Sequence, residues 1–341
     1  MSGPRIAVVG AGLAGATCAR QLADAGAEVQ VFDKSRGVGG RLATRRIALA
    51  EADGSLRTAG FDHGAPAFTA QAAPFVQAVE AAERAGLLAR WAPVLAPRSY
   101  APLAPAALWV ATPDMPAWCR ALLADLTLHT TCQVDALART PAGWQLHSAG
   151  RPVAEGLDAV VLALPLPQAA ALLEPHQPDW ARRAADTEML PGWVLMGTTG
   201  TPDAGPRPWD LAWPSAGPLA CIVRNDAKPG RLASAGRVPW VLHATAAWSR
   251  THLASPAAEV QAALQQALAD WLGRPLAWHH AVVHRWRFAS APRGAAVVGR
   301  CWWDGRLGLG VCGDALGGAG VEGAWLSGHA LASAMVTGAT A

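Results

Sequence analysis

Glycine spacing near the start of the chain is the strongest chemical signal in this sequence. Gly10, Gly12 and Gly15 form a G-x-G-x-x-G pattern. It directly follows the apolar run Arg5–Val9 and opens a helical stretch. The first glycine permits a tight turn, the second lets backbone N–H groups approach a pyrophosphate, and the third lets the helix pack closely on the strand. Asp33 ends the next apolar run, where a carboxylate can bond a ribose, so these residues predict a dinucleotide site.

The far end of the chain carries a second glycine-rich stretch. Gly308, Gly310 and Gly313 repeat the same spacing, but Asp314 and more glycines follow where the dinucleotide motif requires a helix start. We therefore do not count this match as a second dinucleotide motif. Asp314 comes directly after an apolar run, which predicts a buried strand, and the following glycine-rich turn opens a helix. An Asp so placed can bond ligand hydroxyl groups, and the helix N-terminus favours negative charge.

The segment after Asp33 separates flavin from nicotinamide binding. It reads Lys34-Ser-Arg-Gly-Val-Gly-Gly-Arg-Leu-Ala-Thr44 and resembles the large FAD family that includes amine oxidases and phytoene desaturases. The resemblance implies that Arg41 reaches the pyrophosphate or the substrate side of FAD, which suits its fork of donors. It also implies that Asp314 bonds the ribityl hydroxyls, while the next helix N-terminus faces the flavin's pyrimidine edge, where negative charge develops on reduction.

Both ends of the chain are therefore expected to hold one FAD. The predicted cofactor-binding residues are Gly10, Gly12, Leu13, Ala14, Gly15, Asp33, Lys34, Gly40, Arg41, Asp62, Gly64, Ala65, Val134, Gly313, Asp314, Gly320, Val321 and Ala324. Covalent attachment of the flavin stays open, since no motif indicates it. No spacing of cysteines or histidines indicates a metal site, and none is predicted.

Further segments narrow the resemblance to renalases and their bacterial relatives. These segments are Lys34–Arg46, Phe61–Ala65, Asp158–Pro165, Ala227–Arg231 and His284–Ala289. The resemblance implies an FAD-dependent oxidase that acts on the 2- and 6-dihydro isomers of NAD(P)H. The substrate hydride would go to flavin N5, and dioxygen would reoxidise the flavin to give hydrogen peroxide. The expected partners are thus a small-molecule substrate and dioxygen.

Hydride transfer needs a dry, aromatic pocket more than it needs acid–base groups. The predicted catalytic residues are His63, Lys228, Trp286 and Arg287. The resemblance places His63 near the isoalloxazine, although a hydrogen-bonded core histidine is its alternative. Lys228 is the candidate for holding water near N5, and Arg285 or Arg287 can face an anionic substrate group. We expect at least two of these tryptophans to line the pocket: Trp193, Trp209, Trp213, Trp240, Trp286, Trp302 and Trp303.

Two other functions stay open. An amine (C–N) oxidase can use the same flavin, but monoamine oxidases face it with a pair of tyrosines. This chain has one tyrosine, Tyr100, and only two lysines, Lys34 and Lys228, which disfavours that chemistry. A flavin-binding protein without redox turnover is the second alternative.

The elements that must position these residues follow the order of an α/β protein. Strand, helix and strand are expected at Arg5–Val9, Leu13–Ala25 and Glu28–Phe32, and Ser35–Arg46 is expected to be a loop that enters a helix. We predict a Rossmann-like FAD-binding domain assembled from discontinuous segments, 1–72, 110–165 and 295–341. A mixed α+β substrate domain, 73–109 and 166–294, is inserted in it and includes a helix at Ala257–Leu272.

Composition excludes several other classes. Of the 341 residues, 52% are hydrophobic and 16% charged, and the net charge of +3 comes from scattered arginines. Nucleic acid would need a clustered basic stripe, and none is visible. No apolar run reaches the ~20 residues of a membrane span. The six widely spaced cysteines are typical of reduced thiols, so a cytoplasmic protein is expected. The oligomeric state stays open.

Overall fold

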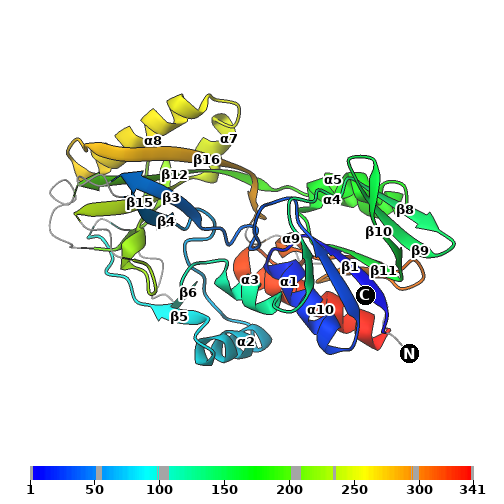
Figure 1. Cartoon of the computed structure of the whole chain (residues 1–341). Helices are drawn as coiled ribbons and strands as arrows, with labels where there is room; N and C mark the ends of the chain where they lie inside the picture. Colours follow the sequence, from blue (N-terminus) through cyan, green and yellow to red (C-terminus); the bar gives the residue numbers. More distant parts are fainter. Residues whose placement is uncertain are drawn as a thin grey trace.

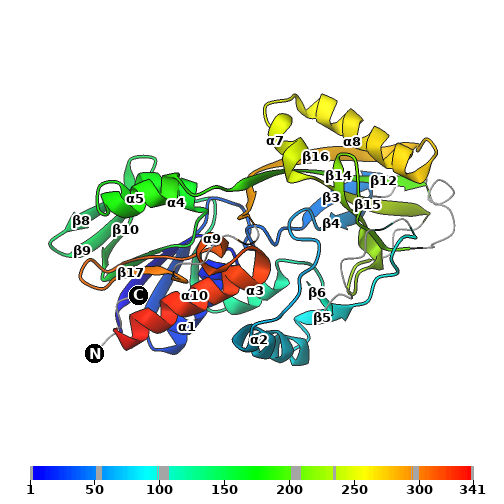
Figure 2. The ribbon, with the colours of Figure 1, turned by 180° about the vertical axis from the view of Figure 1, so that it is seen from behind.

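The structure, a computed structural model, describes residues 3–50, 56–97, 99, 107–200, 209–232, 236–292, 294 and 299–338. Two lobes lie side by side, each built around its own sheet (Figures 1 and 2). The first lobe contains a six-stranded sheet, and the second contains a five-stranded sheet. Both ends of the described chain belong to the first lobe (Figure 1).

The sheet of the first lobe has the order β17-β18-β11-β1-β2-β7. Its neighbouring strands are parallel except for the antiparallel pair β17–β18. Its strands are β1 (Arg5–Val9), β2 (Glu28–Phe32), β7 (Thr127–His129), β11 (Ala159–Leu162), β17 (Trp302–Asp304) and β18 (Leu309–Val311). Its helices are α1 (Leu13–Asp24), α3 (Ala117–Leu122), α4 (Leu166–Leu173), α5 (Pro178–Ala185), α9 (Asp314–Gly317) and α10 (Gly320–Thr337). This parallel, helix-covered sheet confirms the predicted α/β, Rossmann-like class.

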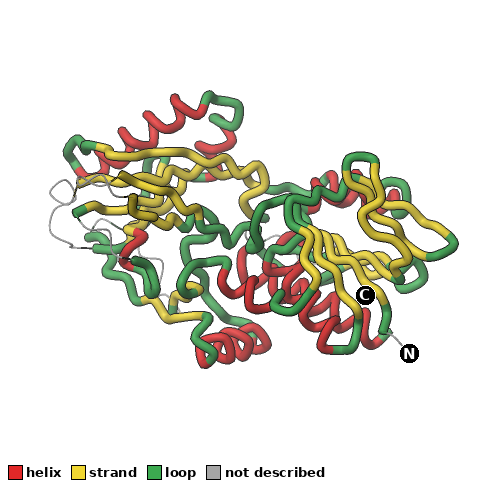
Figure 3. Tube along the Cα trace, viewed as in Figure 1, coloured by secondary structure: helices red, strands yellow, loops and turns green. Residues whose placement is uncertain are grey.

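Both faces of this sheet are buried, which explains the uninterrupted apolar runs in its strands. Along β1, Ile6 and Val8 belong to the core that includes α1 and α10. Ala7 and Val9 point the other way, into a core shared with a small antiparallel sheet. That sheet is formed by β8 (Ala136–Thr140), β9 (Gly143–Ser148) and β10 (Arg151–Leu157). The strands stand between these two layers in Figure 3.

Helices α1 and α10 bring the two ends of the chain into direct contact. At Gly328 of α10, an added Cβ would lie 2.2 Å from the carbonyl oxygen of Ala14 in α1. Only glycine therefore allows the backbones to approach this closely. The close crossing holds the middle of α10 against the start of α1, next to the first glycine motif.

The second lobe is an antiparallel sheet with the order β13-β14-β15-β12-β16. Its strands are β12 (Leu190–Gly200), β13 (Leu211–Ala212), β14 (Leu219–Arg224), β15 (Arg237–Ala244) and β16 (Trp278–Ser290). Helices α7 (Ala246–Thr251) and α8 (Ala257–Leu272) cover one face, and the hairpin of β3 (Arg45–Ala50) and β4 (Leu56–Phe61) lies on the other side (Figure 1). The predicted helix at Ala257–Leu272 is confirmed.

A smaller unit lies below the junction of the two lobes in Figure 1. It consists of α2 (Ala73–Arg84), β5 (Leu88–Trp91) and β6 (Leu108–Ala111), with the short 3-10 turn η1 (Asn225–Ala227) nearby on the second lobe. Phe75 of α2 packs against Trp118 and Trp325, with ring centroids 6.0 and 5.6 Å apart. This aromatic contact joins α2 to the first lobe.

Among the residues that the structure describes, no helix is long and apolar enough to cross a bilayer.

Two expectations differ from the structure. Residues after Ser35 do not enter a helix, because Arg45–Ala50 pairs with Leu56–Phe61 as an antiparallel hairpin. The lobes also divide the chain differently from the predicted domains: the β3–β4 hairpin lies against the second lobe. Helices α4 and α5 pack into the first lobe, since Leu166 and Leu173 share a core with the strands of its sheet. The two helices that follow β11 thus pack back onto its own sheet before the chain enters β12 of the second lobe.

Candidate functional site

One large cavity is lined by residues of both lobes. Its volume is about 2990 Å³, roughly three times the upper end of the range for drug-sized ligands, ~1,000 Å³. Its walls include the turn between β1 and α1, the loop after β2, the last part of β16 and the start of α10. The cavity therefore has room for a dinucleotide and for a second small molecule beside it.

The three motif glycines occupy three different environments. Gly10 has φ +112°, and a Cβ there would lie 2.4 Å from the carbonyl oxygen of Ala163. A Cβ on Gly15 would lie 1.9 Å from the carbonyl oxygen of Gly10. By contrast, a Cβ on Gly12 would meet only Gly40 Cα, at 3.9 Å. Gly12 lines the cavity at the N-terminus of α1, so its missing side chain leaves space where helix N–H groups favour an anion.

Asp33 stabilises this turn through hydrogen bonds and still has acceptor positions for a ligand. Its Oδ2 accepts a hydrogen bond from Ala11 N at 2.8 Å, and its Oδ1 accepts one from Ser35 N at 2.7 Å. A carboxylate offers about four acceptor positions, so both oxygens retain a lone pair for a ribose hydroxyl. Asp33 and Lys34 both line the cavity.

Arg41 and Asp314 join the two ends of the chain across the cavity wall. Arg41 Nη1 and Nη2 donate to the two carboxylate oxygens of Asp314 at 2.8 and 2.7 Å. Ala291 N also donates to Asp314, at 3.3 Å. The Asp314 side chain is 4% exposed, whereas that of Arg41 is 28% exposed. The sequence predicted a separate cofactor contact for each residue, and the structure adds this bidentate ion pair between them.

The start of α10 lines the cavity through Gly320 and Val321. Glu322, in the first turn, accepts hydrogen bonds from Gln71 N at 3.0 Å and Ala72 N at 2.7 Å. Its carboxylate therefore ties α10 to the segment that begins α2. Glu322 was missing from the predicted site, although an acidic residue in a first helical turn is a signal that could have found it.

The second lobe contributes an aromatic wall. The His63 ring stacks on Trp286, with centroids 5.4 Å apart, and meets His284 edge-on at 4.9 Å. Trp286 Nε1 donates to the backbone carbonyl of His63 at 2.9 Å, which fixes their relative positions. Burial, with a smaller effect from His284, lowers the pKa of His63 to about 4. His63 Nδ1 is buried without a hydrogen-bond partner among the described residues.

His243 is a wall residue that is absent from the predicted site. It lies on β15 and lines the cavity, and its Nε2 is buried with no partner among the residues described. Burial, and then the charge of Lys228, lower its pKa to about 3. His63 and His243 are therefore neutral imidazoles at neutral pH. The available signal was a single histidine in the otherwise apolar run from Val238 to Ala244.

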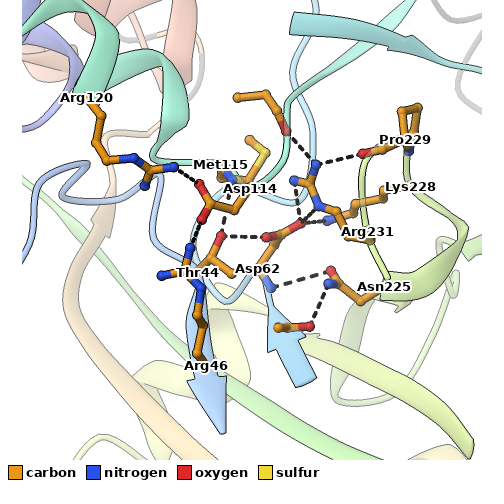
Figure 4. Close-up of polar contacts among 12 residues, drawn as sticks. Thr44, Arg46, Asp62, Asp114, Met115, Arg120, Asn225, Lys228, Pro229 and Arg231 are labelled. Carbon is orange, nitrogen blue, oxygen red and sulfur yellow. Dashed lines mark hydrogen bonds and ion pairs between the residues drawn. The ribbon is translucent and has the colours of Figure 1, made fainter. Parts of the chain in front are cut away.

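Asp62 and Lys228 lie behind this wall, in a buried polar cluster (Figure 4). Lys228 Nζ donates to Asp62 Oδ2 at 2.9 Å, and both side chains are fully buried. Arg231 donates to the same oxygen at 2.8 and 3.0 Å, and Thr44 Oγ1 donates to Oδ1 at 2.6 Å. Neither Asp62 nor Lys228 lines the cavity. This burial differs from the predictions that Asp62 binds the cofactor and that Lys228 holds water near flavin N5.

Most other predicted site residues meet at the cavity. Gly15 does not line it, because its role is to let α1 pack on the turn. Tryptophans 193, 213 and 286 line the wall, and so does Trp91, which the sequence analysis did not include; Trp209, Trp240, Trp302 and Trp303 do not. Tyr100 lies outside the described residues. The remaining predicted residues on the cavity wall are Gly10, Gly12, Leu13, Ala14, Asp33, Lys34, Gly40, Arg41, His63, Gly64, Ala65, Val134, Arg287, Gly313, Asp314, Gly320, Val321 and Ala324.

Comparisons with known proteins agree with this architecture. Residues 8–82 match the family described as NAD(P)-binding Rossmann-like domain. The tRNA 5-methylaminomethyl-2-thiouridine biosynthesis bifunctional protein MnmC of Magnetococcus marinus is 29% identical over 194 residues. That match covers 46% of this chain and only 29% of the relative's length.

Two solved structures resemble the whole chain. A protein assigned as a protoporphyrinogen oxidase, from Exiguobacterium sp. 255-15, has a TM-score of 0.73 and 12% identity, over 99% of this chain and 100% of that one. An oxidoreductase from Methanosarcina mazei has a TM-score of 0.61 and 15% identity, over 97% and 99%. The chain therefore contains a Rossmann-like dinucleotide-binding domain, and over nearly its whole length it has the fold of these two proteins.

Proposed function

We propose that this chain is an FAD-dependent oxidoreductase of the renalase type, which oxidises dihydronicotinamide isomers with dioxygen as the electron acceptor. One observation carries the proposal: a single cavity connects the glycine turn at Gly12 to a wall of tryptophans and neutral histidines. The turn suits a pyrophosphate, and the wall suits a flat, uncharged ring. Both ligands of the proposed reaction therefore have a matching surface.

The residues present fit FAD. Gly12 leaves space at the N-terminus of α1, and a Cβ on Gly320, at the start of α10, would meet no atom within 4 Å. Eight basic and four acidic side chains line the cavity, so it attracts anionic ligands. Asp33 retains lone pairs for a ribose, as described above. When bound, FAD would accept a hydride from the substrate and pass the electrons to dioxygen.

The protein's own contribution is positioning and exclusion of water. Trp286 is held by the backbone carbonyl of His63, so the wall keeps one shape. The unpartnered His63 Nδ1 and His243 Nε2 can each bond an uncharged polar group such as a carboxamide. Arg287, exposed on β16 at the cavity, can meet a substrate phosphate. Such fixed contacts align a donor carbon with its acceptor, which is the main requirement for hydride transfer.

Anaerobic reduction tests this proposal. The purified protein should be yellow, and its flavin absorbance should bleach rapidly on mixing with 2- or 6-dihydro-NAD(P). Benzylamine and protoporphyrinogen serve as competing reductants, the latter because a solved structure of similar fold is assigned to that activity. Bleaching by benzylamine or by protoporphyrinogen, without bleaching by 2- or 6-dihydro-NAD(P), would show that the proposed substrate is wrong. A flavin that no reductant bleaches would leave a binding protein without turnover.

A matched pair of variants separates the wall from general packing. Trp286→Leu should slow the bleaching at least about tenfold, because it removes the surface that aligns the substrate. Trp271→Leu is the control, since Trp271 of α8 packs against Trp209 and neither tryptophan lines the cavity. Equal rates in the two variants would remove Trp286 from the proposed site.

A further inference from the structure

The polar cluster behind the cavity wall contains more cations than anions. Asp62 is the single carboxylate between Lys228 and Arg231, and these side chains are 0%, 0% and 5% exposed. Beside it, Asp114 is likewise held by two cations, Arg46 and Arg120, and the two groups meet where Thr44 bonds Asp62 and accepts from Met115 N (Figure 4). Each buried carboxylate is therefore paired with two positive charges.

Only one layer of side chains separates Lys228 from the cavity. Its Nζ lies 5.7 Å from the centre of the Trp91 ring, and Trp91 lines the cavity. Cys221 and His243, two further wall residues, also feel the charge of Lys228. In a buried region an excess charge is screened weakly, so it acts across that layer.

We propose that the Asp62–Lys228–Arg231 cluster makes this end of the cavity accept uncharged rings and reject cationic ones. The proposal rests on the proposed function for the identity of the rings. A dihydropyridine is uncharged, and loss of a hydride (one proton and two electrons) turns it into a cationic pyridinium. The cluster would thus admit the substrate and expel the product. The same charge would exclude protonated amines.

The Asp62 carboxylate stabilises the charged forms of Lys228 and Arg231, so the cluster keeps its net positive charge. The two cations and the Thr44 hydroxyl lower the pKa of Asp62, so it stays ionised despite its burial. Burial lowers the pKa of Lys228, but contact with the Asp62 carboxylate opposes that effect. In the ion pairs that the structure shows, Asp62 is ionised and both Lys228 and Arg231 are charged, which leaves one positive charge over. It is this charge that a cation in the cavity would meet.

The test uses two ligands of the same shape that cannot donate a hydride. 1-Methylnicotinamide is a cation, and 3-methylbenzamide is its uncharged isostere. Calorimetric titration of the purified protein should show tighter binding of 3-methylbenzamide, by about twentyfold. That factor follows for a ring stacked on Trp91, roughly 9 Å from Lys228 Nζ, at an effective dielectric constant of about 20.

Lys228→Met should bring the two affinities together by tightening the cation alone, while Asp62 keeps Arg231 as its partner. Lys228→Arg retains the charge and should restore the discrimination. Equal binding of the two ligands by the natural protein, no binding of 3-methylbenzamide, or an unchanged ratio in Lys228→Met would each overturn the proposal. If Lys228→Met does not fold, the ratio in the natural protein decides. These titrations need no turnover, so a failure to oxidise dihydronicotinamides would refute the proposed function separately.

Discussion

The ion pair between Arg41 and Asp314 should respond unequally to the loss of its two partners. Arg41→Met leaves the Asp314 carboxylate 4% exposed and without its cation. Removal of one partner from a buried pair lowers the free energy of unfolding by about 3–5 kcal/mol. We expect a loss in this range for Arg41→Met, because the Asp314 carboxylate stays buried. Asp314→Asn leaves Arg41, which is 28% exposed and can turn toward water. Its cost should be smaller, about 1–3 kcal/mol, close to that of a lost charged hydrogen bond.

Urea unfolding of the two variants, with the cofactor removed beforehand, measures this difference without any effect of cofactor affinity. The double variant should cost clearly less than the sum of the two single ones, because the pair is removed once. Cofactor content measured before removal supplies a second result: Asp314→Asn should retain less FAD than the natural protein. Equal costs for both variants, or strictly additive costs, would refute the reasoning from burial.

Three further predictions concern the glycine turn and the pH dependence of stability. Gly15→Ala should unfold the first lobe or lower the free energy of unfolding by more than about 3 kcal/mol, since the added Cβ would lie 1.9 Å from a carbonyl oxygen. Gly37→Ala is the control in the same melting assay, because a Cβ there would meet no atom within 4 Å. Gly12→Ala should melt normally yet lose most bound flavin, measured by absorbance, because its methyl group would fill the anion space; full retention would contradict that role. The lowered pKa of His63 means that the folded state resists protonation. The neutral His63 ring contributes stability that is complete above pH 6.5 and is lost as pH falls toward 4. His63→Gln should therefore remove about 1–3 kcal/mol of the loss in unfolding free energy that the natural protein shows over that window, measured by urea unfolding at each pH.

Local sequence predicted the parts of the site that a backbone turn dictates. Gly10 and Gly15 are required by contacts within a few residues of the chain or with one neighbouring strand, and this explains why their spacing is readable. Asp314 was found because a buried strand and a glycine-rich turn flank it. The α/β class followed from apolar runs in strands buried on both faces.

Long-range partners were not readable in the same way. Asp62 and Lys228 are separated by 166 residues, and only the folded chain shows that their motifs form one cluster. The Arg45–Ala50 strand was missed because its polar start resembles the loop before it, and its partner strand alone makes it β structure. His243 was missed since a strand pattern says nothing about which face borders a cavity.

The position of β18 has a consequence for how the protein is made. β11 pairs with β18 on one edge, and α10 then closes over α1. While a ribosome is still adding residues 163–308, β11 has no neighbour on that side, and an uncovered strand edge invites pairing with other chains. The proposed FAD site is likewise incomplete until Asp314 meets Arg41. On the proposed function, loading with a dinucleotide is therefore expected only after β18 and Asp314 have been synthesised, and rapid closure of this edge should protect the nascent chain from aggregation.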